Sequence, residues 1–110
     1  MSQAQTVTEA TFDQEVLGSG TPVLVDFWAE WCQPCKLVEP ALERIVEERN
    51  GEIKLVKVNI DEEQGLAQRY GVASIPFMVL FKDGEPAAAA IGAQPKSALE
   101  RSLGLEPVEA

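Results

Sequence analysis

The stretch Val23-Leu24-Val25-Asp26-Phe27-Trp28-Ala29-Glu30-Trp31-Cys32-Gln33-Pro34-Cys35-Lys36 decides the fold. It joins an apolar run typical of a buried strand to a helical pattern that begins at Pro34. The chain's two cysteines, Cys32 and Cys35, stand at this junction in CxxC spacing. A dithiol at a strand-to-helix turn lies at the positive end of the helix dipole, which favours the thiolate. Because the thiolate is the form that attacks disulfides, the stretch predicts a redox centre.

Strand and helix signals alternate on both sides of this stretch. Toward the N-terminus, Thr8 is expected to cap a short helix that ends at the glycines of 18–20. Toward the C-terminus, a helix is expected over 34–49, with a kink at Pro40. The apolar residues of this helix trace one helical stripe: Leu37, Val38, Ala41, Leu42, Ile45 and Val46.

The rest of the chain continues the alternation and ends in a hairpin. Asp61 with Gln64 resembles a capping box, Asp83-Gly84 is a hairpin turn, and Pro86 indicates an edge strand. The expected elements are strands at 53–60, 77–81 and 85–91, a helix opened by the Asp61–Gln64 capping box and closed by Gly71, and a last helix at 95–103. This order predicts an α/β fold with a mixed sheet and helices on both faces.

Length and composition indicate one globular domain spanning 1–110, with 45% apolar residues. Nine basic and eighteen acidic residues give a net charge of -9. Neither nucleic acid nor an anionic membrane is therefore an expected partner. The first ten residues lack the features of a signal peptide, and no apolar run is long enough to span a bilayer. We expect a cytoplasmic monomer, and in that compartment a CxxC pair is more often catalytic than structural.

The dithiol has four possible interpretations. A zinc or iron–sulfur site needs four ligands, and the chain offers two cysteines and no histidine. A structural disulfide closing so short a ring stabilises by only about 2 kcal/mol, and two unlinked buried thiols would pack as small apolar side chains. A reversible dithiol–disulfide couple fits best. In it Cys32, before the first helical turn, is the attacking thiol, and the more shielded Cys35 is the resolving thiol.

With these residues placed, the chain resembles the thioredoxin family nearly from end to end. The resemblance rests on 25–32 and on Pro40, Asn59-Ile60-Asp61, Tyr70-Gly71-Val72, Ile75-Pro76, Leu80-Phe81-Lys82-Asp83-Gly84 and Gly92. It implies the thioredoxin fold, a mixed five-stranded sheet flanked by four helices on both faces. It also implies a thiol–disulfide oxidoreductase that reduces protein disulfides through Cys32 and Cys35. No cofactor or metal would be bound, and the electrons would come from NADPH through thioredoxin reductase.

The resemblance assigns roles to two charged residues. It implies that Asp26 is buried behind the dithiol and assists proton transfer from Cys35, so that its pKa is raised by burial. It also places Lys57 within reach of Asp26, where it modulates that carboxyl. From the sequence alone, Asp26 fits a carboxylate reaching water at the end of the sheet equally well. Lys57 taken alone reads as a solvated lysine on an alternating strand.

The family also implies a docking face for disulfide-containing client proteins. Pro76 is expected to be cis and to face the dithiol, and the backbone around 73–76 is expected to pair with an extended client segment. The expected contact residues are Trp28, Trp31, Gln33, Pro34, Val72, Ala73, Ser74, Ile75, Pro76 and Gly92.

Several positions depart from the family pattern. Gln33 gives WCQPC in place of WCGPC, and Ala73-Ser74 replace a basic residue and glycine, so redox potential and client preference are expected to differ. Gln94-Pro95 in place of a serine cap and Ser102 in place of an aromatic residue predict a weakly held last helix. Two alternative functions remain: a disulfide oxidase or isomerase, and a non-catalytic thioredoxin-like binding protein or holdase. Oxidising relatives usually carry histidine between the cysteines, which this chain lacks.

Overall fold

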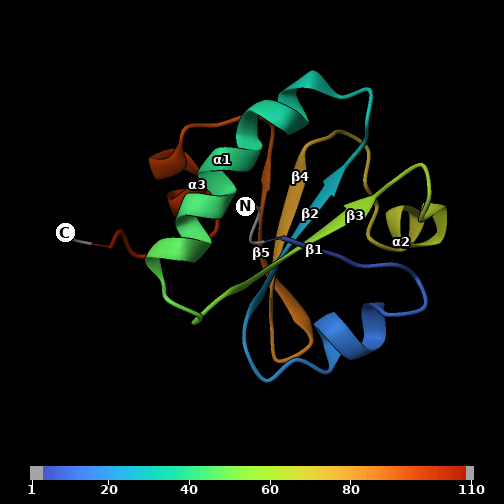
Figure 1. Cartoon of the computed structure of the whole chain (residues 1–110), viewed down its shortest axis with the longest axis horizontal. Helices are drawn as coiled ribbons and strands as arrows, with labels where there is room; N and C mark the ends of the chain where they lie inside the picture. The colour runs from blue at the N-terminus through green and yellow to red at the C-terminus, as the bar shows by residue number, and fades with distance from the viewer. Residues whose placement is uncertain (1–3, 109–110) are drawn as a thin grey trace.

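Five strands form one mixed sheet in the order β1–β3–β2–β4–β5 (Figure 1). The structure is a computed structural model that describes residues 4–108. β1, β3 and β2 are parallel, whereas β4 is antiparallel to β2 and β5 is antiparallel to β4. The strands are β1 (Gln5–Thr6), β2 (Val23–Trp28), β3 (Lys54–Asn59), β4 (Phe77–Lys82) and β5 (Glu85–Ile91). The predicted mixed five-stranded sheet is confirmed.

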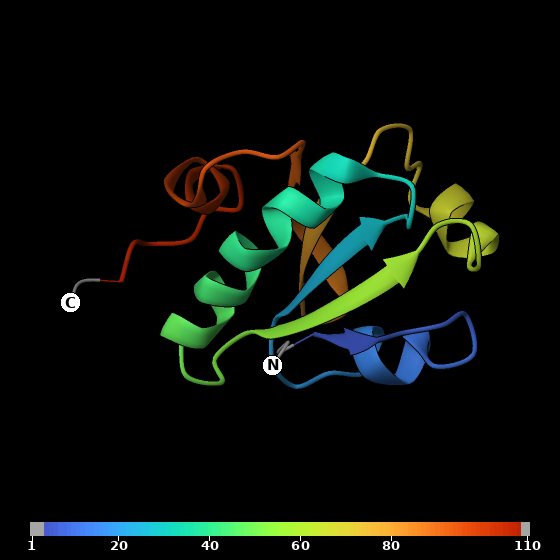
Figure 2. The same ribbon diagram turned by 45° about the horizontal axis from the view of Figure 1, so that its top comes forward.

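Helices cover both faces of this sheet, as predicted. α1 and α3 lie on one face, and the π-helical turn η1 and α2 lie on the other (Figures 1 and 2). Along β2 the side chains alternate between these layers. Leu24 joins the cluster under α1, whereas Val25 and Phe27 join the cluster under η1 and α2. The helices are η1 (Asp13–Leu17), α1 (Gln33–Glu48), α2 (Gln64–Arg69) and α3 (Lys96–Ser102).

The buried face of α1 is narrower than the sequence stripe predicts. Leu37 is 67% exposed, and Ala41 is only half-buried. The buried positions of the helix are Cys35, Val38, Leu42, Ile45 and Val46. Leu37 lies on the helix face that carries the exposed Gln33 and Pro40, since positions three or four residues apart share a face. Leu37 therefore fits the stripe by spacing and yet lies outside the buried face.

The start of α2 is fixed by a distant residue rather than by the predicted capping box. The side chain of Glu63, the N-cap residue, makes no capping hydrogen bond. The Gln64 side chain donates to the Asp61 carbonyl, and Asp61 does not cap the helix. The backbone N–H of Gly65 donates to Glu9 Oε2 at 2.8 Å, and the N–H of Glu9 donates to Glu63 Oε1 at 3.0 Å. Glu9 thus satisfies an orphan donor of the helix from the other end of the chain.

The expected Thr8 cap is also absent. The first helical segment begins at Asp13, with no side-chain cap at Phe12. The Thr8 carbonyl, rather than its hydroxyl, accepts hydrogen bonds from the N–H groups of Thr11 and Phe12. Thr8 therefore closes a turn that leads into η1.

The last helix is anchored by its apolar face and by a buried ion pair that the sequence did not indicate. Leu99 and Leu103 are buried against α1 and the sheet. The Arg49 guanidinium, itself buried, donates to Glu100 Oε2 at 2.9 Å and to the Ile45 carbonyl at 3.0 Å. This buried ion pair ties α3 to the end of α1.

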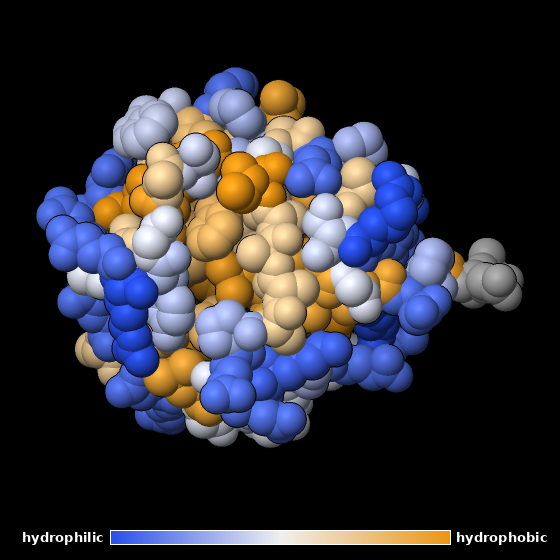
Figure 3. Space-filling model, turned by 180° about the vertical axis from the view of Figure 1, so that it is seen from behind, coloured by the Kyte–Doolittle hydropathy of each residue, from blue (hydrophilic) through white to orange (hydrophobic). Residues whose placement is uncertain are grey.

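β5 is the edge strand that Pro86 indicated. It pairs only with β4 among the described strands, and its exposed residues include Ala87, Ala89 and Ile91. Figure 3, seen from behind Figure 1 on the β5 side, shows an apolar band bordered by hydrophilic residues. A shallow groove there is lined by Tyr70, Phe77 and Val79 together with the alanines of β5.

Candidate redox site

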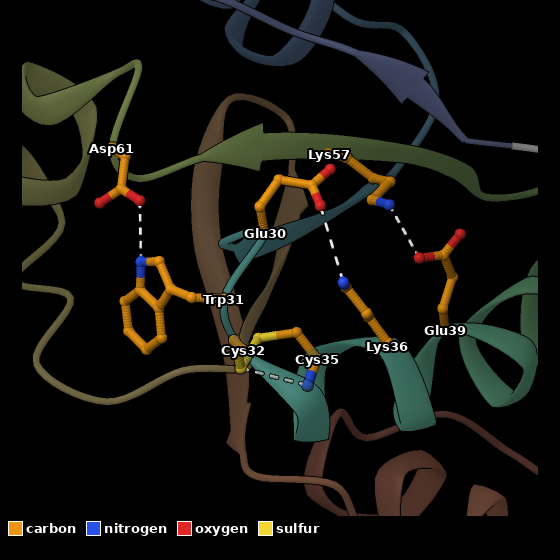
Figure 4. Close-up of a disulfide and its surroundings, with 8 residues drawn as sticks. All are labelled: Glu30, Trp31, Cys32, Cys35, Lys36, Glu39, Lys57 and Asp61. Atoms are coloured by element: carbon orange, nitrogen blue, oxygen red, sulfur yellow. Dashed lines mark hydrogen bonds and ion pairs between the residues drawn. A yellow bond between two sulfur atoms is a disulfide. The ribbon is translucent and has the colours of Figure 1, made fainter.

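The two cysteines lie at the N-terminal end of α1, where they form a disulfide (Figure 4). Cys32 is the N-cap residue, and the backbone N–H of Cys35 donates to Cys32 Sγ at 3.2 Å. Gln33 and Pro34 form the first turn, a position that suits proline because no helical donor is lost there. After reduction, the same N–H group and the helix dipole would stabilise a thiolate on Cys32.

The two sulfurs differ in their access to solvent. Cys32 is 4% exposed and Cys35 is 1% exposed. Both pack in a small cluster with Ala29, and the half-buried Trp28 and Ile75 lie against it. Both cysteines are thus buried in an apolar cluster, and Cys32 is the slightly more exposed of the two.

Asp26 is buried on the sheet face that lies beneath α1. It alternates with Leu24, which belongs to the cluster under this helix. Asp26 is 1% exposed, and its Oδ1 has no hydrogen-bond partner within residues 4–108. Burial raises the pKa of the Asp26 carboxyl to about 7, the positive charge of Lys57 opposes this rise, and the negative charge of Glu39 adds to it. The expected burial and raised pKa are confirmed.

Lys57 lies opposite Asp26 in the parallel register of β2 and β3. Its Nζ nevertheless donates to Glu39 Oε2 of α1 at 2.8 Å (Figure 4). The same Nζ sits 4.1 Å from the centre of the Trp28 ring. Lys57 therefore lies on the strand next to the buried Asp26 carboxyl, and it forms its ion pair with the Glu39 carboxylate.

The expected docking residues occupy the end of β2, the first turn of α1 and three loops, those before α1, before β4 and after β5. Trp31 is 68% exposed, and its Nε1 donates to Asp61 Oδ2 at 2.8 Å (Figure 4). The Ile75–Pro76 peptide bond is cis, as expected, and the N–H of Gly92 donates to the Pro76 carbonyl at 2.8 Å. The peptide groups of 73–75 make no backbone hydrogen bond to other described residues.

The structure does not bring all of these residues to the dithiol. Val72 is half-buried against the cluster under η1 and α2, on the opposite layer from α1. Ala73 and Ser74 are exposed. Ile75 packs against the cluster under η1 and α2 and also against the small cluster that holds the two cysteines. It therefore links the 72–76 loop to the disulfide.

Sequence reasoning missed four residues around the site. Asp61 holds the exposed indole of Trp31, and Asn59 Oδ1 accepts the N–H groups of Asp61 and Glu62, which fixes their turn. Glu39 engages Lys57, and Leu37 adds an exposed apolar side chain one turn after Gln33. An asparagine before an acidic pair is a turn signal that could have identified Asn59. Asp61 pairs with Trp31 and Glu39 pairs with Lys57, both of which lie far away in the sequence. No local sequence pattern therefore predicts either contact.

A disulfide at a helix N-terminus, packed in an apolar cluster and with a titratable carboxyl beneath the same helix, can cycle with its dithiol form. That chemistry defines a thiol–disulfide oxidoreductase. Among residues 4–108, no group of three or more His, Cys, Asp or Glu side chains could hold a metal ion. In the same range, no helix has the length and apolarity to cross a membrane.

Comparison with known proteins identifies the family. The thioredoxin family model matches residues 3–104. Thioredoxin 1 of Synechococcus elongatus is 50% identical over 103 residues, which are 94% of this chain and 96% of that protein. The thioredoxin of Pseudomonas aeruginosa is 50% identical over 97 residues, 88% of this chain and 90% of that protein. The chain belongs to the thioredoxin family, and it is a protein-disulfide reductase.

Proposed function

We propose that Cys32 attacks the client disulfide and that Cys35 resolves the mixed disulfide. The supporting observation is the hydrogen bond from the Cys35 N–H to Cys32 Sγ at the start of α1. This hydrogen bond would stabilise the thiolate form of Cys32 in the reduced protein, and Cys35 is the more deeply buried of the two cysteines. Both steps are thiol–disulfide exchanges, and the net reaction passes two electrons to the client.

The two exchanges balance in atoms and charge. The Cys32 thiolate bonds to one client sulfur, and the other client sulfur leaves as a thiolate. The Cys35 thiolate then bonds to Cys32 Sγ, the bond between Cys32 and the client breaks, and the client sulfur that was attached to Cys32 leaves as a thiolate. The products are the Cys32–Cys35 disulfide and a client dithiol, whose thiolates take up protons.

In the second exchange, Asp26 is the proton acceptor for Cys35. A carboxyl with a pKa of about 7 is ionised in about half of the molecules at pH 7. It is therefore poised to act as a general base near neutral pH. Lys57, on the neighbouring strand, modulates this ionisation through its positive charge.

Clients dock against the surface around Cys32. The exposed Trp31 and the half-buried Ile75 offer apolar contacts beside the disulfide. The unpaired peptide groups of 73–75 are available to an extended client segment, a mode that recognises main chain more than sequence. Trp28, Gln33, Pro34, Val72, Pro76 and Gly92 complete the proposed binding face.

The remaining parts of the proposal concern partners and setting. We assign re-reduction of the disulfide to thioredoxin reductase with electrons from NADPH, and no bound cofactor to the chain itself. The net charge of -9 disfavours nucleic acid and anionic membranes as partners. We propose that the protein acts as a cytoplasmic monomer and as one domain over 1–110.

A trapping experiment tests the roles of the two thiols. Cys35→Ser should accumulate a mixed disulfide with a client at Cys32, because the resolving thiol is missing. Cys32→Ser is the matched control and should trap little. Peptide mapping that finds the client on Cys35 of the Cys32→Ser protein, and none on Cys32 of the Cys35→Ser protein, would reverse the assignment.

The equilibrium redox potential against glutathione tests the direction of the reaction. A strongly reducing value supports the reductase, and a value near the poise of the secretory pathway would indicate an oxidase or isomerase. Full function of a protein with both cysteines changed to serine would indicate a non-catalytic holdase.

A further inference from the structure

We propose that Glu39 is a positioning residue: its ion pair holds the Lys57 ammonium away from Asp26 and thereby controls the protonation of Asp26 during the resolving step. The inference rests on the proposed role of Asp26 as the proton acceptor. It assigns a part in the reaction to a half-buried residue of α1 outside the CxxC motif.

The strand register gives Asp26 a natural partner. Asp26 on β2 lies opposite Lys57 on β3, and both side chains face α1, since Leu24 and Leu55, two positions earlier on each strand, belong to the cluster under that helix. On the other side, the β4 residue opposite Asp26 is Met78, which carries no charge. The Lys57 ammonium is thus the cation placed to pair with the buried carboxyl.

α1 supplies a competing carboxylate. Glu39 Oε2 accepts from Lys57 Nζ at 2.8 Å. The face of the Trp28 ring, 4.1 Å from Nζ, holds the ammonium from a second side. Asp26 Oδ1, buried nearby, receives no hydrogen bond from residues 4–108. Figure 4 shows the Lys57 side chain running from β3 toward Glu39 on α1.

Glu39 acts on Asp26 in two ways with the same sign. Glu39 pairs with the Lys57 ammonium, which would otherwise stabilise an Asp26 carboxylate. The negative charge of Glu39 also disfavours a negative charge on Asp26, and both effects raise the pKa of Asp26. Lys57 from β3 and Glu39 from α1 are the charged groups that shift the pKa of Asp26. Cys35, at the start of α1, titrates only after reduction. Without Glu39, Lys57 is free to pair with Asp26, which then ionises at lower pH and becomes a weaker base.

The test compares Glu39→Gln with Glu43→Gln, which removes the same charge one turn later on the same helix. In each oxidised protein, the carboxyl carbon of Asp26 is titrated by NMR. In parallel, the rate at which a preformed Cys32–client mixed disulfide is resolved is measured against pH. Glu39→Gln should lower both midpoints by about one pH unit, the effect of one unit charge at short range. Glu43→Gln should leave both unchanged.

Further variants separate the possible outcomes. Glu39→Asp keeps the charge on a shorter side chain and should lower the midpoint by less than Glu39→Gln. The proposal is overturned if Asp26 titrates identically in the Glu39→Gln and Glu43→Gln proteins. It is also overturned if Glu39→Gln lowers the midpoint equally in a Lys57→Met background, because Glu39 would then act without Lys57.

Asp26→Asn distinguishes this inference from the function on which it rests. If the resolution rate keeps its pH midpoint in Asp26→Asn, Asp26 is not the proton acceptor and the proposed function fails at that point. If Asp26→Asn removes the midpoint and Glu39→Gln leaves it in place, only the role of Glu39 is refuted.

Discussion

Replacing Asp26 by asparagine should stabilise the protein at neutral pH while slowing the resolving step. Burial raises the pKa of the carboxyl from 3.8 to about 7. Below pH 3.8 the carboxyl is protonated in both the folded and unfolded states, and no stability is lost. As the pH rises from 3.8 to about 7, the unfolded state ionises and the folded state does not, so the free energy of unfolding falls.

The loss follows from the size of the pKa shift. A shift of about three units at 1.36 kcal/mol per unit amounts to about 4 kcal/mol above pH 7. The asparagine amide must still be buried beside a position without a hydrogen-bond partner, which offsets about 1 to 2 kcal/mol. Asp26→Asn should therefore gain about 2 to 3 kcal/mol at pH 8, roughly 10 °C in Tm.

The assay is urea unfolding of the oxidised protein between pH 4 and pH 8, with the disulfide intact. At pH 4 the variant should be less stable by about 1 to 2 kcal/mol, because only the cost of the buried amide remains, and the difference should reverse sign as the pH rises. Asp83→Asn is a suitable control, because Asp83 is exposed and its positive φ of 52° suits asparagine. Parallel pH dependences of wild type and Asp26→Asn, or a less stable variant at pH 8, would refute the reasoning.

Two further predictions concern the scaffold. Leu37→Ala should change the free energy of unfolding by less than about 0.5 kcal/mol because Leu37 is mostly exposed, whereas Val38→Ala should lower it by about 2 kcal/mol. Equal losses in urea unfolding would contradict the exposed position of Leu37. Arg49→Met should cost about 3 kcal/mol because it leaves the buried Glu100 carboxylate with only the longer 3.4 Å ion pair to Lys96 Nζ. Adding Glu100→Leu should recover most of that loss, and a double variant as unstable as the single one would argue against the ion pair.

The sequence predicted the features that depend on short-range patterns. The apolar run over 23–28, the turn at Asp83-Gly84 and the edge proline Pro86 each placed a strand or its border correctly. The position of the cysteines between a strand and a helix was also sufficient to put Cys32 at the N-cap of α1. These signals are local, because backbone sterics and the alternation of side chains act over a few residues.

The tertiary structure decided which groups meet across elements. Leu37 fits the helical stripe by spacing, yet the sheet and α3 cover only part of that stripe. Glu9, rather than the local Asp61, satisfies the start of α2.

The strongest example lies behind the dithiol. The sequence determined that a redox pair would sit at a helix N-terminus and that a carboxyl would lie in the strand before it. Only the packing of α1 over β2 and β3 buries Asp26, raises its pKa to about 7 and pairs Lys57 with Glu39. Ionisation depends on desolvation and on charges within a few ångströms, and those distances exist only in the folded chain.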